Sequence, residues 1–288
     1  MTRFSHFVAI DWSGAVGPRH KAIAMAIADA KGGAPVLVKR EKGWSRQEVL
    51  ALLRDDLPPA TLVGLDLGIS LPFVDCGSFF PGWHESPSDA RSLWQMIERI
   101  CLDDPHLAAS SFVDHPDASA YFRRHGGREG ARFGGGRGRF RVTEIEQAKL
   151  GCKPYSNFNL VGAAQVGKSS LTGMRMLHAL RGHLPVWPID PLPAKGSVIV
   201  EIYTSLAAIT AGRTASRAKM RTFEELNAAL INLGSPPIAA KGAIDDHASD
   251  ALVTSAWLRT VADNPALWAP AAMTAQVAQT EGWTFGVA

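Results

Sequence analysis

The sequence has few cysteines and no long hydrophobic run. Its three cysteines lie far apart and form no CxxC pair, so they make neither a disulfide framework nor a zinc knuckle and suit a reducing compartment. No apolar run approaches the roughly 18 residues that cross a bilayer. Asp11 interrupts the first apolar segment before the core of a signal peptide could form. We therefore expect a cytoplasmic protein that does not enter a membrane.

Charge is also scarce, and the excess of positive over negative charge lies in one segment. Charged residues are 20% of the 288 residues and hydrophobic residues 46%, a composition that excludes wholesale disorder and provides a sizeable core. Residues 123–141 contain seven arginines and one acid, Glu129, so this segment carries +6 while the net charge is only +3. The remaining chain is therefore slightly acidic, and basic character belongs to one segment.

The hydrophobic pattern predicts an α/β fold with a mixed sheet. Apolar runs at residues 7–10, 22–28 and 35–39 are separated by turn residues and predict three antiparallel strands. A helix capped by Ser45 follows, and then a strand at residues 61–65. Because a helix between strands returns the chain in one direction, this fourth strand should lie parallel to the first.

The rest of the chain predicts further helices around one more strand. The expected strand covers residues 197–202, and the expected helices cover residues 87–101, 143–150, 169–184, 222–233 and 246–262. We interpret residues 1–288 as a single domain. Residues 74–196 would form a mainly helical insertion that contains the arginine-rich loop 123–141.

Three predicted strands carry an acid at or near their end, namely Asp11, Asp66 and Glu201. Ligand sites form at the carboxyl edge of an open α/β sheet, and neighbouring carboxylates there need a cation. The last long helix adds His247 and Asp250, which are three residues apart and share a helix face. The pattern predicts a shared site for Mg²⁺ or Mn²⁺. Each acid taken alone would more simply be a turn residue or a helix cap.

The order of these elements and the position of their acids resemble the ribonuclease H-like superfamily. A closer resemblance is to an uncharacterised family of predicted ribonuclease H-like nucleases. The matching segments are residues 7–15, 63–69, 200–204 and 246–252. The HxxDA sequence of the final helix is also similar to that of bacterial Holliday-junction resolvases.

This resemblance implies a two-metal nuclease site. Asp11 would bridge the metals, Asp66 would bind one of them, and His247 and Asp250 would complete the ligand set. Glu201 matches the motif of the predicted nucleases, and its role is open. In such a site one ion activates a water and the other stabilises the leaving oxygen, so no protein nucleophile is needed.

A second motif offers an alternative function. Residues 162–169 satisfy GxxxxGK[ST], and Gly162, Gly167, Lys168 and Ser169 would cradle nucleotide phosphates in a P-loop-type NTP-binding protein. The preceding segment, residues 155–161, is polar and makes a poor central strand. The glycine turn after Asp11 also resembles that of actin-like kinases, which normally use two such domains.

The arginine-rich segment predicts a nucleic-acid partner. Arg128, Arg132, Arg137 and Arg139 could contact phosphates, while two phenylalanines in the segment could stack on unpaired bases. The alternative is a mobile, solvated loop. A third reading of the whole chain is a ribonuclease H-like binding module without catalysis. DNA, RNA and small nucleotides all remain open as substrates, and so does the oligomeric state.

Overall fold

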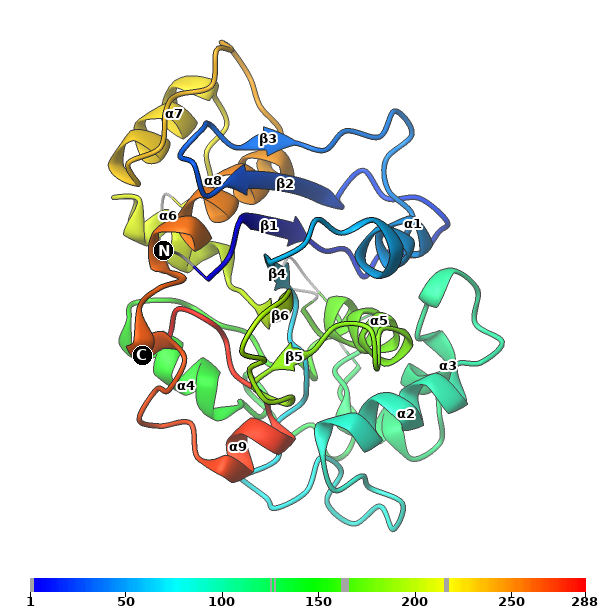
Figure 1. The fold of residues 1–288 in the computed structure, drawn as a ribbon. Helices are drawn as coiled ribbons and strands as arrows, with labels where there is room; N and C mark the ends of the chain where they lie inside the picture. Colours follow the sequence, from blue (N-terminus) through cyan, green and yellow to red (C-terminus); the bar gives the residue numbers. More distant parts are fainter. Residues whose placement is uncertain (1–2, 125, 127, 162–165, 215–217) are drawn as a thin grey trace.

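The computed structural model describes residues 3–124, 126, 128–161, 166–214 and 218–288. Its centre is a six-stranded sheet in the order β3-β2-β1-β4-β6-β5 (Figure 1). The strands are β1 His6–Asp11, β2 Ala24–Asp29, β3 Val36–Leu37, β4 Thr61–Asp66, β5 Val186–Trp187 and β6 Val198–Glu201.

The sheet is antiparallel on one side and parallel on the other. Strand β2 pairs antiparallel with both β1 and β3, whereas β1, β4, β6 and β5 run parallel to one another. The prediction of a mixed sheet with three antiparallel strands followed by a parallel one is therefore confirmed. The parallel pairs bring the ends of β1, β4 and β6 to one edge of the sheet.

Helices cover both faces of this sheet (Figure 1). The α-helices are α1 Arg46–Ala51, α2 Ala90–Ile100, α3 Ser110–Val113, α4 Val142–Lys149, α5 Val166–Ala179, α6 Thr204–Thr210, α7 Phe223–Asn232, α8 Asp246–Val261 and α9 Ala275–Thr280. A π-helical stretch, Leu52–Asp56, extends α1, and short 3-10 turns occupy Pro105–Leu107, Ala118–Tyr121 and Pro265–Leu267.

Alternating side chains of the strands divide the interior into two cores. In β1, Val8 and Ile10 pack with residues of α1, α2 and α5, while Phe7 and Ala9 pack with residues of α6, α7 and α8. This is the two-residue period of a strand that is buried on both faces. It explains why the parallel strands read as continuous apolar runs.

Helix α8 lies against β1 and β2 at the centre of the sheet. A Cβ atom on Gly64 in β4 would come within 2.7 Å of the Ile202 side chain and 3.0 Å of the Leu258 side chain in α8. Glycine at this position therefore allows α8 to pack closely against the sheet.

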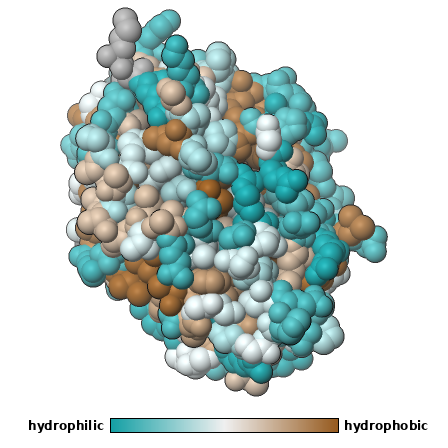
Figure 2. Space-filling view, turned by 60° about the horizontal axis from the view of Figure 1, so that its bottom comes forward, coloured by the Kyte–Doolittle hydropathy of each residue, from teal (hydrophilic) through white to brown (hydrophobic). Residues whose placement is uncertain are grey.

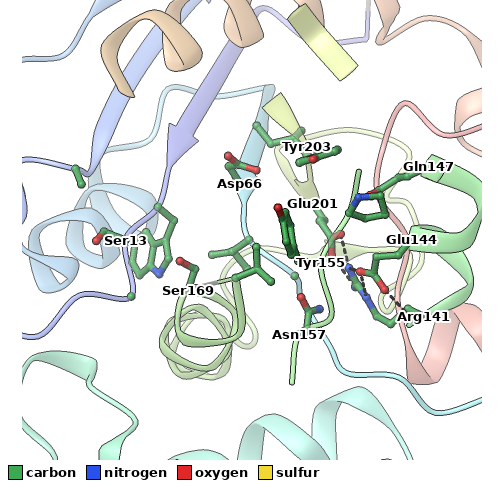
Figure 3. A pocket seen from close by; sticks show the side chains of 18 of the residues that line it. Ser13, Asp66, Arg141, Glu144, Gln147, Tyr155, Asn157, Ser169, Glu201 and Tyr203 are labelled. Atoms are coloured by element: carbon green, nitrogen blue, oxygen red, sulfur yellow. Dashed lines mark hydrogen bonds and ion pairs between the residues drawn. The ribbon is translucent and has the colours of Figure 1, made fainter. Parts of the chain in front are cut away.

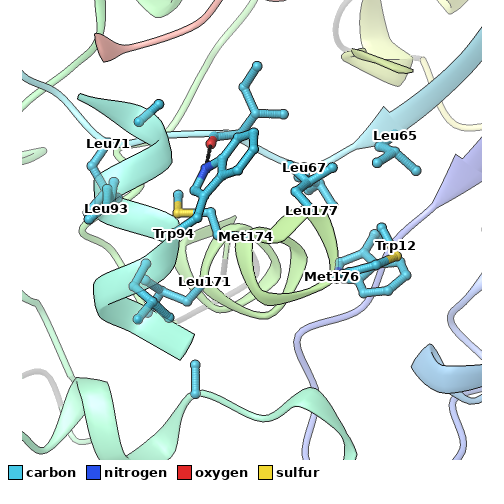
Figure 4. Packing of buried hydrophobic residues seen from close by; sticks show 14 of the residues in the cluster. Trp12, Leu65, Leu67, Leu71, Leu93, Trp94, Leu171, Met174, Met176 and Leu177 are labelled. Atoms are coloured by element: carbon cyan, nitrogen blue, oxygen red, sulfur yellow. Dashed lines mark hydrogen bonds between the residues drawn. The ribbon is translucent and has the colours of Figure 1, made fainter. Parts of the chain in front are cut away.

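Helices α2 and α5 pack together on the opposite face (Figure 4). Leu93 and Trp94 of α2 meet Leu171 and Met174 of α5 in this layer. The Trp94 ring also donates a hydrogen bond of 2.7 Å to the carbonyl of Ile69, just after β4. This bond ties the helical layer to the loop that leaves the candidate site.

Residues 74–196 contain α2 to α5 and, in addition, the edge strand β5, which pairs with β6. Hydrophilic and hydrophobic residues are interspersed on the face drawn in Figure 2, where hydrophobic patches are separated by polar surface. Within the described ranges, none of the helices combines the length and the apolar character that crossing a bilayer requires.

Candidate active site at the carboxyl edge of the sheet

Asp11 and Asp66 are direct neighbours at the sheet edge. They are register partners at the last position of the parallel pair β1 and β4. Asp11 is buried and Asp66 is half-buried. The Asp66 carboxylate accepts a hydrogen bond of 3.2 Å from Thr204 Oγ1, at the start of α6. The predicted adjacency of these two acids is thus present in the structure.

The first turn of α8 brings His247 and Asp250 to the same place. Asp245 is the N-cap, and its side chain accepts hydrogen bonds from the backbone of His247 and Ala248. His247 Nδ1 lies 2.8 Å from Asp11 Oδ2. Asp250 is 4% exposed and lies next to the helix face that packs on the sheet. We call Asp11, Asp66 and Asp250 the Asp11 cluster.

The Asp11 cluster holds more negative charge than its surroundings neutralise. Burial, followed by the charges of Asp11 and Asp250, raises the pKa of Asp66 well above its usual value. Burial likewise raises the pKa of Asp250 from 3.8 to about 6, although the nearby ammonium of Lys219 opposes this shift. A raised carboxyl pKa means that the ionised form is the unfavourable one in the folded protein.

Two basic side chains approach this cluster. Lys219 Nζ donates to Asp250 Oδ2 at 2.7 Å. Burial lowers the pKa of Lys219, but Asp250 outweighs this effect and the net shift is upward. The hydrogen bond with Asp11 raises the pKa of His247, so its imidazolium form is stabilised. Lys219 and protonated His247 therefore neutralise part of the negative charge of the three aspartates.

The described residues include no group of three or more His, Cys, Asp or Glu side chains arranged to hold a metal ion together. Two of the expected ligands are engaged elsewhere, because Asp250 faces Lys219 and Asp11 faces His247. The donor types do suit a hard divalent cation, which prefers carboxylate oxygens. A metal bound by Asp250 Oδ2 would compete with the Lys219 ammonium for this oxygen.

A cavity of about 510 Å³ opens beside Asp66 and His247. Figure 3 shows Asp66 and Ser13 on one side of it, Arg141 and Glu144 on the other, and Tyr155 between them. Tyr155 is 47% exposed. The cavity therefore combines an acidic wall with an aromatic ring and can admit a ligand of the size of a nucleotide.

Glu201 lies in the same cavity but has a different environment. Its carboxylate binds the Arg141 guanidinium at 2.6 Å, and Arg141 also binds Glu144 at 2.6 Å. The Ile69 amide donates to Glu201 at 2.8 Å, and Thr284 Oγ1 donates at 2.5 Å. We call Arg141, Glu144 and Glu201 the Arg141 cluster. The carboxylates of Glu144 and Glu201 accept hydrogen bonds from several donors, so Glu201 is placed to stabilise the fold.

The phosphate-loop motif is only partly described. Gly162 lies outside the described residues, while Gly167, Lys168 and Ser169 form the first turn of α5. The described residues immediately before the motif contain no strand. The strand–loop–helix context of a phosphate loop is therefore missing on the strand side.

The arginines of the basic segment have diverse environments. Arg139 binds Asp75 at 2.5 Å and the backbone carbonyls of Phe79 and Ser78 at 2.7 and 2.8 Å. Arg132 donates to the Pro81 carbonyl and, at 3.0 Å, to the Tyr121 hydroxyl. The expectation of a solvated loop is wrong for Arg139, whose side chain is 12% exposed, whereas Arg132 is exposed as that expectation requires.

The other two arginines expected to contact nucleic acid lie nearer to the cavities. Arg137 donates to the carbonyl of Pro154, and its guanidinium lies 5.8 Å from the centre of the Tyr155 ring. Arg128 is exposed and lines a second cavity. These positions leave both side chains close to the surface on which a ligand would enter.

Sequence reasoning missed several residues of the site. Lys219 lies outside the regular elements, where no periodic signal marks it. Tyr155, Asn157 and Tyr203 line the cavity, but only the folded chain brings them there. Arg141 is the last of the seven arginines in residues 123–141, and Glu144, three residues later, is the one sequence signal of its pairing. Comparison with family models, curated proteins and solved structures finds no match to this chain.

Proposed function

We propose that this protein is a divalent-metal-dependent phosphodiesterase that acts on nucleic acid, with a ribonuclease H-like fold. The strand order and the change from antiparallel to parallel pairing support the fold assignment. The observation that carries the activity is the pairing of Asp11 with Asp66 in register, with Asp250 contributed by α8.

The residues of the site fit a divalent cation by their chemistry. Three carboxylates and one imidazole are available, and the raised pKa values of Asp66 and Asp250 reflect charge that a cation would relieve. Asp11 and Asp66 would hold the ion, and Asp250 and His247 would complete its ligands. When bound, Mg²⁺ or Mn²⁺ supplies an activated water and stabilises the leaving oxygen.

The protein's own residues contribute binding and proton transfer. His247 contacts Asp11 through Nδ1, and this hydrogen bond raises the pKa of the imidazole, which favours a proton on the ring beside Asp11. Tyr155 offers a ring at the centre of the cavity on which a base can stack. Ser13 and Ser169 line the opposite wall with hydroxyl groups suited to phosphate oxygens.

The test is cleavage of labelled single-stranded and duplex oligonucleotides in the presence of Mg²⁺ or Mn²⁺. We expect Asp11→Asn and Asp66→Asn each to reduce the rate by about 100-fold or more, because each removes a charged ligand of the cation. Calorimetric titration with Mn²⁺ should show a corresponding loss of binding.

Asp56→Asn is the matched control, since Asp56 is an exposed carboxylate at the end of the π-helical turn. Its cleavage rate and Mn²⁺ binding should equal those of the wild type. Undiminished cleavage in both Asp11→Asn and Asp66→Asn would reject the proposed site.

A further inference from the structure

A second cavity adjoins the candidate active site. Its volume is about 300 Å³, and it shares Gly14 and Ala15 with the first cavity. The loop after β1 therefore has the acidic cavity on one side and this second cavity on the other. A chain-like ligand that passes over this loop would enter both.

The wall between the two cavities is firmly held. Arg46 is buried and donates to the carbonyls of Ser13 at 2.9 Å and Ala15 at 2.5 Å. A Cβ atom on Gly14 would lie 2.4 Å from the carbonyl carbon of Lys168, so only glycine allows the loop to cross the first turn of α5. The two cavities thus have a fixed relative position.

The second cavity has a cationic rim. Lys168, Arg124 and Arg128 line it, and the only acid among its lining residues is Asp114. Asp114 lies 3.4 Å from Arg124, and its side chain is 74% exposed. The excess of two positive charges makes this cavity complementary to an anion, in contrast to the acidic cavity beside it.

Lys168 is the best placed of these cations. Its side chain is half-buried, and its ammonium makes no hydrogen bond or ion pair with another residue in the described part of the chain, although its backbone carbonyl accepts a hydrogen bond of 3.0 Å from Thr172 Oγ1. The floor below it is apolar and includes Leu160 and Leu171. Val16, at the entrance, is 84% exposed. A charged rim above an apolar floor suits a phosphate attached to a sugar and an unpaired base.

We propose that the second cavity is a subsite for single-stranded nucleic acid. It would bind a backbone phosphate on Lys168 and Arg128, while another phosphodiester of the same strand lies at the Asp11 cluster. This inference rests on the proposed function only where it places a second phosphodiester of the bound strand at the Asp11 cluster. Binding of the strand at the subsite requires neither metal nor catalysis.

The experiment measures binding without cleavage. A fluorescently labelled single strand of about 12 nucleotides, as DNA and as RNA, is titrated with the full-length protein in EDTA and followed by anisotropy. We expect Lys168→Ala and Arg128→Ala each to weaken binding several-fold and the double variant to weaken it by about tenfold or more. The slope of log affinity against log salt should fall by about 1.4 in the double variant, since two phosphate contacts are lost.

Lys31→Ala is the matched control. Lys31 is exposed in the turn after β2, at the end of the sheet opposite Asp11, so its loss should leave affinity and salt slope unchanged. Lys168→Arg keeps the charge and should retain most of the binding, which separates a lost contact from a damaged fold.

Several results would overturn the subsite. They are absence of binding by the wild type, equal affinity of the double variant and the wild type, equal weakening by Lys31→Ala, and tighter binding of a blunt duplex than of the single strand. Failure of the proposed function is distinguishable. If no cleavage is found but Lys168→Ala weakens binding of the single strand, the subsite is supported and the proposed activity is rejected. If Asp11→Asn abolishes cleavage but Lys168→Ala leaves binding unchanged, the subsite alone is rejected.

Discussion

Two groups of acids at one edge of the sheet differ in their supply of hydrogen-bond donors. In the Arg141 cluster, two buried glutamates share one guanidinium and receive further donors from the Ile69 amide and the Thr284 hydroxyl. In the Asp11 cluster, three aspartates face the side chains of Lys219 and His247. Burial raises the pKa of Asp66 and Asp250, as it does that of Glu144, so the two clusters differ in their donors and not in the direction of these shifts. Both groups include the ends of parallel strands.

The difference shows that position at a strand end does not by itself make an acid functional. What separates the clusters is the supply of donors. A carboxylate with complete hydrogen bonding stabilises the fold and has no capacity left for a ligand. A carboxylate with an incomplete set costs stability and can gain from a bound cation, which is the compromise expected at an active site.

The largest effect should follow from removing the cation of the Arg141 cluster. We expect Arg141→Met to lower the free energy of unfolding by about 3–5 kcal/mol, because two buried carboxylates lose their partner. Urea denaturation at neutral pH measures this change. The pKa of Arg141 is raised by its two glutamates despite its burial, which agrees with a strong pairing.

The control compares acids in the two clusters. Glu201→Gln should also destabilise the protein, since it removes the charge that balances Arg141. Asp66→Asn should instead leave stability unchanged or increase it, because it removes one of three mutually repelling carboxylates. Equal destabilisation by both substitutions would show that the two clusters do not differ as we describe.

A somewhat smaller effect concerns pH. The pKa of Asp250 is about 6 in the folded protein and 3.8 ordinarily. Between these values the folded state binds more protons than the unfolded state, so stability falls as the pH rises. The shift corresponds to about 3 kcal/mol. We expect the free energy of unfolding of Asp250→Asn to rise relative to that of the wild type by up to this amount between pH 4 and pH 7. Denaturation at each pH measures this difference.

Asp104→Asn provides a control of opposite sign. Hydrogen bonds from Ser111 outweigh burial and lower the pKa of Asp104. The wild type should therefore become more stable relative to this variant as the pH rises above the depressed pKa. If both variants show the same dependence on pH, burial of Asp250 does not carry the cost that we assign to it.

Much of the fold could be predicted from the sequence, because strands and helices leave periodic patterns. The apolar run ending at Asp11 and the one ending at Asp66 gave both the strands and their parallel pairing. The capping sequence at Ser45 correctly located the first helix. By contrast, β5 has only two residues and no pattern that distinguishes it from a loop.

The candidate site was predictable only in part. Asp11, Asp66, His247 and Asp250 come together because each lies near the end of a regular element whose geometry a sequence can indicate. Lys219 comes from an irregular segment, and the pairing of Arg141 with Glu201 spans 60 residues. Contacts of this kind depend on how loops pack, and hydrophobic periodicity contains no information about them.

The smallest predicted effect concerns Lys219, whose ammonium faces the Asp11 cluster. The Lys219 side chain is 55% exposed, so its ion pair with Asp250 contributes at most about 1 kcal/mol. Lys219→Met should thus change stability by less than this amount. It should also tighten Mn²⁺ binding by about two- to fivefold in a calorimetric titration, because the competing ammonium is gone. Lys31→Met should leave Mn²⁺ binding unchanged. Weaker binding by Lys219→Met would mean that Lys219 supports the acids in their binding arrangement, and the Asp11 cluster would then resemble the Arg141 cluster more closely than its smaller supply of donors indicates.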